Sequence, residues 1–126
     1  EIAVYDKTVD EMVWAYIRSQ DTGNRSDTRW FTIADSKGRG FRIDMVEVPL
    51  SFSAWPYTLE DVQSSTHDYL LPRRKFNTVF VDSKLHGVGG DNSWGARTHP
   101  EYTLSGDRPH TLKFVINLLA GNRRGR

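Results

Sequence analysis

The sequence contains no cysteine, so disulfide bonds, iron–sulfur clusters and thiolate zinc sites are excluded. It also lacks an apolar run of the roughly 18 residues that a membrane-spanning helix needs, and it shows no signal peptide. Charge of one sign is not in excess either, because 17 basic residues face 16 acidic ones and the net charge is +1. Proteins that bind nucleic acid through its phosphates are far more basic. We therefore expect a soluble protein with neither nucleic acid nor membrane as a partner.

Helical signals are almost missing as well. The only one is the segment 58–63, where Thr58 is a suitable N-cap before acidic residues, and it predicts one short helix that crosses between sheets. Stretches typical of strands are frequent instead, at 12–19, 28–34, 41–45, 49–56, 77–85, 101–104 and 112–118, with a hairpin loop at 36–40. The pattern predicts an all-β fold, an antiparallel β-sandwich formed by one domain over residues 1–120. Residues 121–126 are expected to be a frayed tail.

The stretch 87–95 differs from the rest because four of its nine residues are glycine and three are small and polar. Glycine loses much backbone freedom on ordering and favours turns with positive φ, so this composition predicts a shaped loop. The strand-like run 79–82 predicts the strand that leads into it. Trp94 is the one large aromatic side chain of the loop, and its sequence neighbours have too little bulk to cover the indole. We therefore expect an exposed Trp94 that contacts something outside the loop.

The string GVGGDNSWGARTHPEYTL at residues 87–104 resembles the last part of the LacZ-type bacterial beta-galactosidases of glycoside hydrolase family 2. In that family a Gly-Gly-Asp-(Asp/Asn)-Ser-Trp segment ends the final domain. Shorter segments in the family's order extend the resemblance over roughly residues 5–118; they lie at 16–18, 22–25, 28–30, 65–67 and 70–71. One departure is Asp21, since relatives commonly carry a longer glutamate within Pro-Gln-Glu-Asn-Gly-Asn.

The resemblance implies the C-terminal domain of such an enzyme, the fifth or small-chain domain, with a supersandwich of the galactose mutarotase type. It implies that the catalytic carboxylates lie upstream in a (β/α)8 barrel of the same parent chain. Trp94 would reach the mouth of that active site and stack on the β-galactoside substrate, such as lactose, as it first binds. The resemblance also implies no cofactor in this segment, because the family's Mg and Na ions are bound mainly in other domains. The compartment stays open between the cytoplasm and the periplasm of a bacterium.

The residues themselves offer no catalytic pair. Glycoside hydrolysis needs two carboxyl groups, about 5 Å apart in retaining enzymes, one of which is kept protonated. The acidic residues here lie mostly in turns or beside basic residues, as is typical of solvated charges. We therefore expect the isolated chain to be inactive toward galactosides.

The polar side chains of the loop have two possible roles. Asp91 and Asn92, with Ser93, are candidates to bind sugar hydroxyls, or else they bond their own backbone and stiffen the turn, which is the role we favour. Asp82 and His86 are expected to orient the loop. The four histidines lack the spacing of a zinc site, so no metal ligand is assigned. The remaining tryptophans are assigned to the core or to packing between domains: Trp14, Trp30 and Trp55.

Two other functions remain open at this stage. One is a stand-alone, non-catalytic carbohydrate-binding module, and the other is a purely structural or assembly domain. The chain starts within the apolar run 2–5, which suggests a fragment of a longer domain. A missing strand would expose a sheet edge, and an exposed edge invites pairing with another chain, so self-association or a homo-oligomer is expected.

Overall fold

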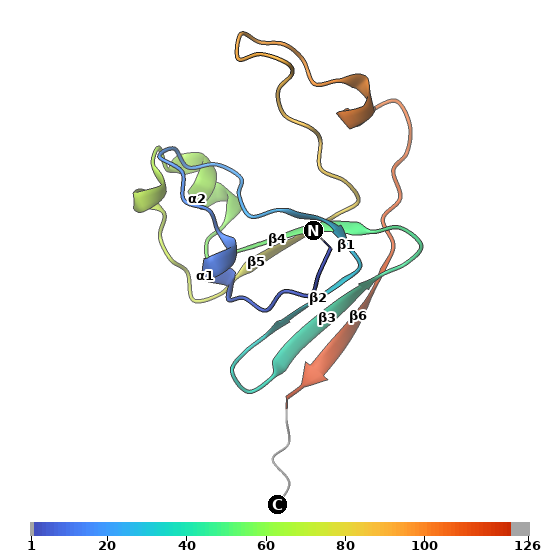
Figure 1. The fold of residues 1–126 in the computed structure, drawn as a ribbon. Helices are drawn as coiled ribbons and strands as arrows, with labels where there is room; N and C mark the ends of the chain where they lie inside the picture. The colour runs from blue at the N-terminus through green and yellow to red at the C-terminus, as the bar shows by residue number, and fades with distance from the viewer. Residues whose placement is uncertain (1, 122–126) are drawn as a thin grey trace, which may run out of the picture. The chain divides into compact units, whose positions relative to one another are not determined.

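The computed structural model describes residues 2–121 and is drawn in Figure 1. Its elements, in chain order, are α1 (Val9–Met12), β1 (Arg25–Thr28), β2 (Trp30–Ala34), β3 (Arg39–Met45), β4 (Leu50–Trp55), α2 (Leu59–Ser64), a 3-10 turn (Asp68–Leu70), β5 (Thr78–Asp82), a second 3-10 turn (Pro100–Tyr102) and β6 (Phe114–Ala120). The predicted all-β class is confirmed, although the described residues contain two short helices where the sequence predicted one. No helix within residues 2–121 has the length and apolar character to cross a bilayer.

The strands form two sheets of three, with the orders β1-β4-β5 and β2-β3-β6. The chain divides into two compact units. Unit 1 comprises Glu1–Arg25 and Phe52–Val81, and unit 2 comprises Ser26–Ser51 and Asp82–Arg126. Helix α2 connects β4 to β5, which are neighbours in one sheet, so the predicted crossover between sheets is wrong.

In unit 2, the predicted hairpin of β2 and β3 is confirmed. The two strands pair antiparallel, and the register brings Phe31 opposite Ile43, both of them buried. The turn between the strands is fixed by Asp35, whose Oδ1 accepts hydrogen bonds from the backbone N–H groups of Lys37 (2.8 Å) and Arg39 (3.0 Å). β6 then pairs antiparallel with β3 and forms the edge of this sheet. Alternating apolar residues thus select the inner face, as period-two patterning predicts.

In unit 1, the core is an aromatic cluster around Trp55, with Tyr57 and Val62. The Trp55 ring lies 4.7 Å from the ring of Phe80, centroid to centroid, and its indole N–H donates to the backbone carbonyl of Thr22 at 2.7 Å. Helix α2 starts at the predicted N-cap, because the Thr58 hydroxyl accepts from the N–H of Asp61. The predicted strand 49–56 is confirmed as β4, with all six residues buried.

The predicted strand at 12–19 is wrong. Met12 ends helix α1, which a capping box of Thr8 and Glu11 starts. After the helix, the backbone N–H and C=O of Trp14 are both bonded to the Thr22 hydroxyl, at 2.9 and 3.0 Å, in place of a strand ladder. A side chain thus satisfies the backbone groups that a neighbouring strand would otherwise satisfy.

The predictions for the strand at 101–104, for the three tryptophans and for the tail have different outcomes. The predicted strand at 101–104 is wrong, because Pro100 opens a 3-10 turn there. Trp55 is buried as assigned, whereas Trp14 and Trp30 are exposed and do not belong to the core of either unit. The expected frayed tail at 121–126 lies, from residue 122 on, outside the described residues.

Candidate functional site

The glycine-rich loop belongs to unit 2 and to the long connection between β5 and β6, orange in Figure 1. As predicted, residues 87–95 form neither helix nor strand. The loop is closed at its base by two bonds to Gly87. Its N–H donates to the carbonyl of Tyr102 at 2.8 Å, and its carbonyl accepts from the Thr98 hydroxyl at 2.8 Å.

His86 adds a third tie beside this closure. Its Nδ1 accepts a hydrogen bond from the backbone N–H of Leu104 at 3.0 Å. This hydrogen bond joins the segment that enters the loop, at His86, to the segment that leaves it, at Leu104. His86 therefore contributes to the geometry of the loop base. Asp82, the other residue expected to orient the loop, is the last residue of β5.

Trp94 lies at the tip of the loop with 93% of its surface exposed. Its backbone is nevertheless held, because its N–H donates to the Asn92 side-chain oxygen at 2.8 Å. Gly95 follows with φ 99° and Gly89 precedes with φ 78°, conformations that residues with a Cβ rarely adopt. The loop therefore presents an uncovered indole from a backbone that is turned sharply on both sides.

Asp91 makes a different contact from Asn92. Both of its carboxylate oxygens lie within hydrogen-bond distance of His99 Nε2, at 2.9 and 3.0 Å. His99 Nδ1 in turn lies 3.7 Å from a carboxylate oxygen of Glu101. Asp91 and Asn92 thus each bond within the loop and its return, and both remain exposed enough to reach a ligand.

The carboxyl groups with a resolved shift are all held in the ionised form. Bonds from Thr8 lower the pKa of Glu11, and bonds from Arg39 lower that of Asp35. The guanidinium of Arg42 lowers the pKa of Asp44, and that of Arg74 lowers the pKa of Asp61. A general acid of a glycosidase needs the opposite, a raised pKa.

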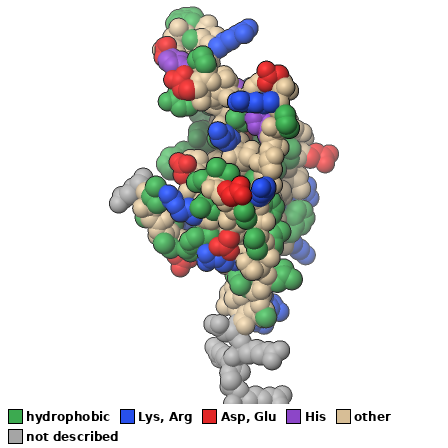
Figure 2. All heavy atoms as spheres, turned by 90° about the vertical axis from the view of Figure 1, so that its right-hand side faces the viewer, with side chains coloured by type: hydrophobic (Ala, Val, Ile, Leu, Met, Phe, Trp, Pro, Cys, Tyr) green, Lys and Arg blue, Asp and Glu red, His purple; other side chains and the backbone are tan. Residues whose placement is uncertain are grey.

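Within residues 2–121, the charged side chains do not gather into a group of three or more His, Asp or Glu that could hold a metal ion. On the face shown in Figure 2, basic and acidic side chains lie interspersed among apolar ones. Such mixing does not favour a polyanion as partner.

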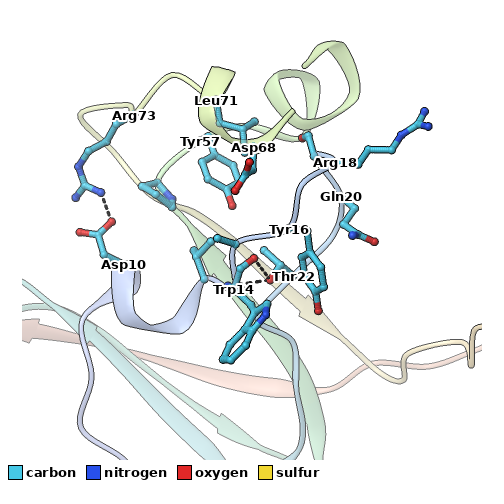
Figure 3. A pocket seen from close by; sticks show the side chains of 14 residues that line it. Asp10, Trp14, Tyr16, Arg18, Gln20, Thr22, Tyr57, Asp68, Leu71 and Arg73 are labelled. Carbon is cyan, nitrogen blue, oxygen red and sulfur yellow. Dashed lines mark hydrogen bonds and ion pairs between the residues drawn. The ribbon is translucent and has the colours of Figure 1, made fainter. Parts of the chain in front are cut away.

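Sequence reasoning missed a second feature, a hollow of about 330 Å³ in unit 1. Its lining comes from residues 10–22 and 56–73, which are far apart in the chain (Figure 3). Aromatic and polar side chains share this lining, among them Trp14, Tyr16, Tyr57 and Asp68. The sequence carries no motif for it, because only tertiary structure brings the two segments together.

Comparison with known proteins identifies the family. Residues 1–116 match the family described as beta galactosidase small chain. The chain is 40% identical over 119 residues to a beta-galactosidase of Priestia megaterium and 35% identical over 116 residues to one of Halalkalibacterium halodurans, covering 94% and 92% of this chain. In both cases it spans 11% of the relative's length. It is also 29% identical to a beta-galactosidase small subunit of Latilactobacillus sakei, over 83% of this chain and 36% of that protein.

The match covers more than nine-tenths of the chain and includes the glycine loop with Trp94 and the residues that close it. The chain therefore belongs to the beta-galactosidase small chain family.

Proposed function

We propose that this chain is the non-catalytic, C-terminal part of a beta-galactosidase that hydrolyses terminal β-D-galactose from β-galactosides such as lactose. In this role Trp94 lies at the rim of an active site formed by the catalytic barrel domain of the parent chain and stacks on the incoming sugar. Asp91 and Asn92 stand beside it and bond hydroxyl groups or hold the loop in shape.

The exposed indole of Trp94 carries this proposal. Trp94 is 93% exposed, yet its backbone is held by Asn92 and flanked by turns at Gly89 and Gly95. A loop whose backbone is already held loses less freedom on binding, which favours association. A pyranose offers a flat C–H face, and covering about 100 Å² of apolar surface in total is worth about 2 kcal/mol.

The catalytic pair is placed outside this chain for a chemical reason. A glycosidase needs one carboxyl group that is protonated before the reaction, and the resolved pKa shifts of Glu11, Asp35, Asp44 and Asp61 all favour the ionised form. The relatives are about nine times as long as the matched part, which leaves ample chain for a catalytic barrel. The isolated chain is therefore inactive in this proposal.

The test is a kinetic comparison in the full-length parent enzyme. We expect Trp94→Ala to raise KM for lactose about tenfold or more, with a smaller effect on kcat, because stacking assists capture of the substrate. Trp94→Phe retains a ring and should recover much of the loss. The isolated chain, assayed in parallel, should release no galactose.

The matched control is Val88→Ala in the same loop. Val88 is as exposed as Trp94 but offers no flat ring, so its removal should leave KM unchanged. An unchanged KM in Trp94→Ala would overturn the proposal and favour a purely structural domain. Tight binding of lactose by the isolated chain, lost in Trp94→Ala, would favour an independent carbohydrate-binding module.

A further inference from the structure

The hydroxyl of Tyr57 opens onto the hollow in unit 1. Tyr57 is 6% exposed and packs its ring against Trp55, yet its hydroxyl makes no hydrogen bond to any of residues 2–121. In Figure 3 the hydroxyl points toward the segment that carries Trp14 and Tyr16. No buried side-chain oxygen within residues 2–121 lacks a hydrogen-bond partner, so this hydroxyl is open to solvent and is available to a ligand in the hollow.

The state of that hydroxyl suits a donor. Burial, and then the charges of Asp68 and Asp21, raise the pKa of Tyr57, so the phenol keeps its proton at neutral pH. Asp68 lines the same hollow, and within residues 2–121 only one of its carboxylate oxygens accepts a hydrogen bond, from the N–H of Tyr69 at 2.9 Å. A donor and a free acceptor therefore face the same space.

An aromatic wall completes the hollow. The backbone of Trp14 is fixed on both sides by the Thr22 hydroxyl, while 70% of its surface is exposed. Tyr16 lies two residues further and is also exposed. The Trp14 backbone is thus held in place while most of the residue is uncovered, so a flat apolar surface is available to a ligand.

Charge and size narrow the class of ligand. The two carboxylates in the lining, Asp10 and Asp68, are matched by the guanidinium groups of Arg18 and Arg73, and Arg73 is paired with Asp10. Such a balance favours an uncharged ligand over an anion or a cation. A volume of about 330 Å³ is at the small end of the range for small-molecule sites, which suits a single ring better than a chain.

We propose that this hollow is a binding site for a neutral ring that carries hydroxyl groups, of the chemical class of a monosaccharide. Its apolar face lies on Trp14, one hydroxyl accepts a hydrogen bond from Tyr57, and another donates to Asp68. The site lies within unit 1, whereas the Trp94 loop belongs to unit 2, and it does not depend on the function proposed for that loop.

The test is an NMR titration of the ¹⁵N-labelled chain with D-galactose, D-glucose and, as an anionic probe, sodium glucuronate. We expect saturable shifts of the Trp14 indole and of the amides of Tyr57 and Asp68 with the neutral sugars, with a dissociation constant on the order of 1 mM. Glucuronate should bind at least threefold more weakly. Shifts confined to the Trp94 loop, or none up to 100-fold that concentration, would overturn the proposal.

Two variants test the contacts. Trp14→Ala and Tyr57→Phe should each weaken sugar binding about fivefold or more, whereas Trp94→Ala should leave the unit 1 shifts unchanged. Tyr57→Phe keeps the packed ring and removes only a solvent-accessible hydroxyl that bonds to none of residues 2–121, so its Tm should stay close to that of the wild type. A marked loss of Tm in Tyr57→Phe, or unchanged affinity in both variants, would contradict the assignment.

Discussion

The carboxylate of Asp61 and the guanidinium of Arg74 form a two-point ion pair. Arg74 Nε lies 2.9 Å from Asp61 Oδ2, and Nη2 lies 2.5 Å from Oδ1. Asp61 Oδ2 also accepts from the N–H of Thr58 at 2.8 Å, while the Arg74 N–H donates to the carbonyl of Pro56 at 2.7 Å. One carboxylate thus joins the start of α2 to the segment that returns toward β5.

The first prediction concerns Asp61→Asn, which keeps the shape and removes the charge. We expect a lower Tm, by about 5 °C or more, because Arg74 loses its ionic partner and the cap of α2 loses its strong acceptor. Asp10→Asn is the matched control, since the Asp10–Arg73 pair is exposed on both sides and such pairs contribute little. Equal losses in the two variants, measured by thermal unfolding, would contradict this role of the buried carboxylate.

The second prediction is a pH dependence of the same ion pair. Arg74 first, and Thr58 second, hold the pKa of Asp61 well below its usual range. In the unfolded chain this pKa is about 3.9, so below about pH 4 the unfolded state binds the proton first and folding loses the contribution of the pair. The urea midpoints of wild type and Asp61→Asn should differ by a constant amount above about pH 5, and the difference should shrink steadily as the pH falls below about 4. A difference that persists unchanged would exclude this linkage.

The parts of the fold that the sequence predicted are those that local pattern determines. The β2–β3 hairpin follows from alternation of apolar residues about a turn, and helix α2 follows from its Thr58 cap. Helix α1 was missed although Thr8-x-x-Glu11 is a recognisable capping box. The segment after it could not be predicted, because a hydroxyl eight residues away, that of Thr22, replaces the strand partner of Trp14.

The Trp94 loop and the unit 1 hollow also differ in how far the sequence predicts them. Exposure of Trp94 was predictable, because the small residues around it cannot cover an indole. The unit 1 hollow was not, because it depends on Tyr57 and Asp68 meeting the segment of Trp14 through tertiary contacts. The composition of a short segment can predict a loop, whereas no sequence motif marks a pocket that two distant segments form together.

The third prediction concerns the free edge of β6. This strand is an edge of its sheet, carries no charged residue over Phe114–Ala120, and exposes Ile116 and Leu118. An antiparallel second copy centred on Asn117 would place Ile116 opposite Leu118 and no like charges together. Because uncharged edge strands pair readily, we expect self-association of the isolated chain that rises with concentration, measured by light scattering after size exclusion.

Leu118→Lys should shift that equilibrium to the monomer, because a lysine on the edge opposes pairing. Val88→Lys is the control, since it adds the same charge at an equally exposed position on the loop. Monomeric wild-type chain at high concentration, or equal effects of the two lysines, would refute pairing through β6.

The fourth prediction tests how the loop holds Trp94. A Cβ at Gly90 would overlap the carbonyl oxygen of Arg97 and crowd Ala96, whereas a Cβ at Gly106 would meet nothing within 4 Å. Gly90→Ala must therefore displace the loop, and Gly106→Ala should not. In the isolated chain we expect Gly90→Ala to shift the NMR signals of Trp94 while those of β2 and β3 stay in place. In the parent enzyme the same change should raise KM for lactose several-fold. If Gly90→Ala moves the Trp94 signals but leaves KM as in Gly106→Ala, the position of the indole does not matter for substrate capture, and the proposed role of the loop fails.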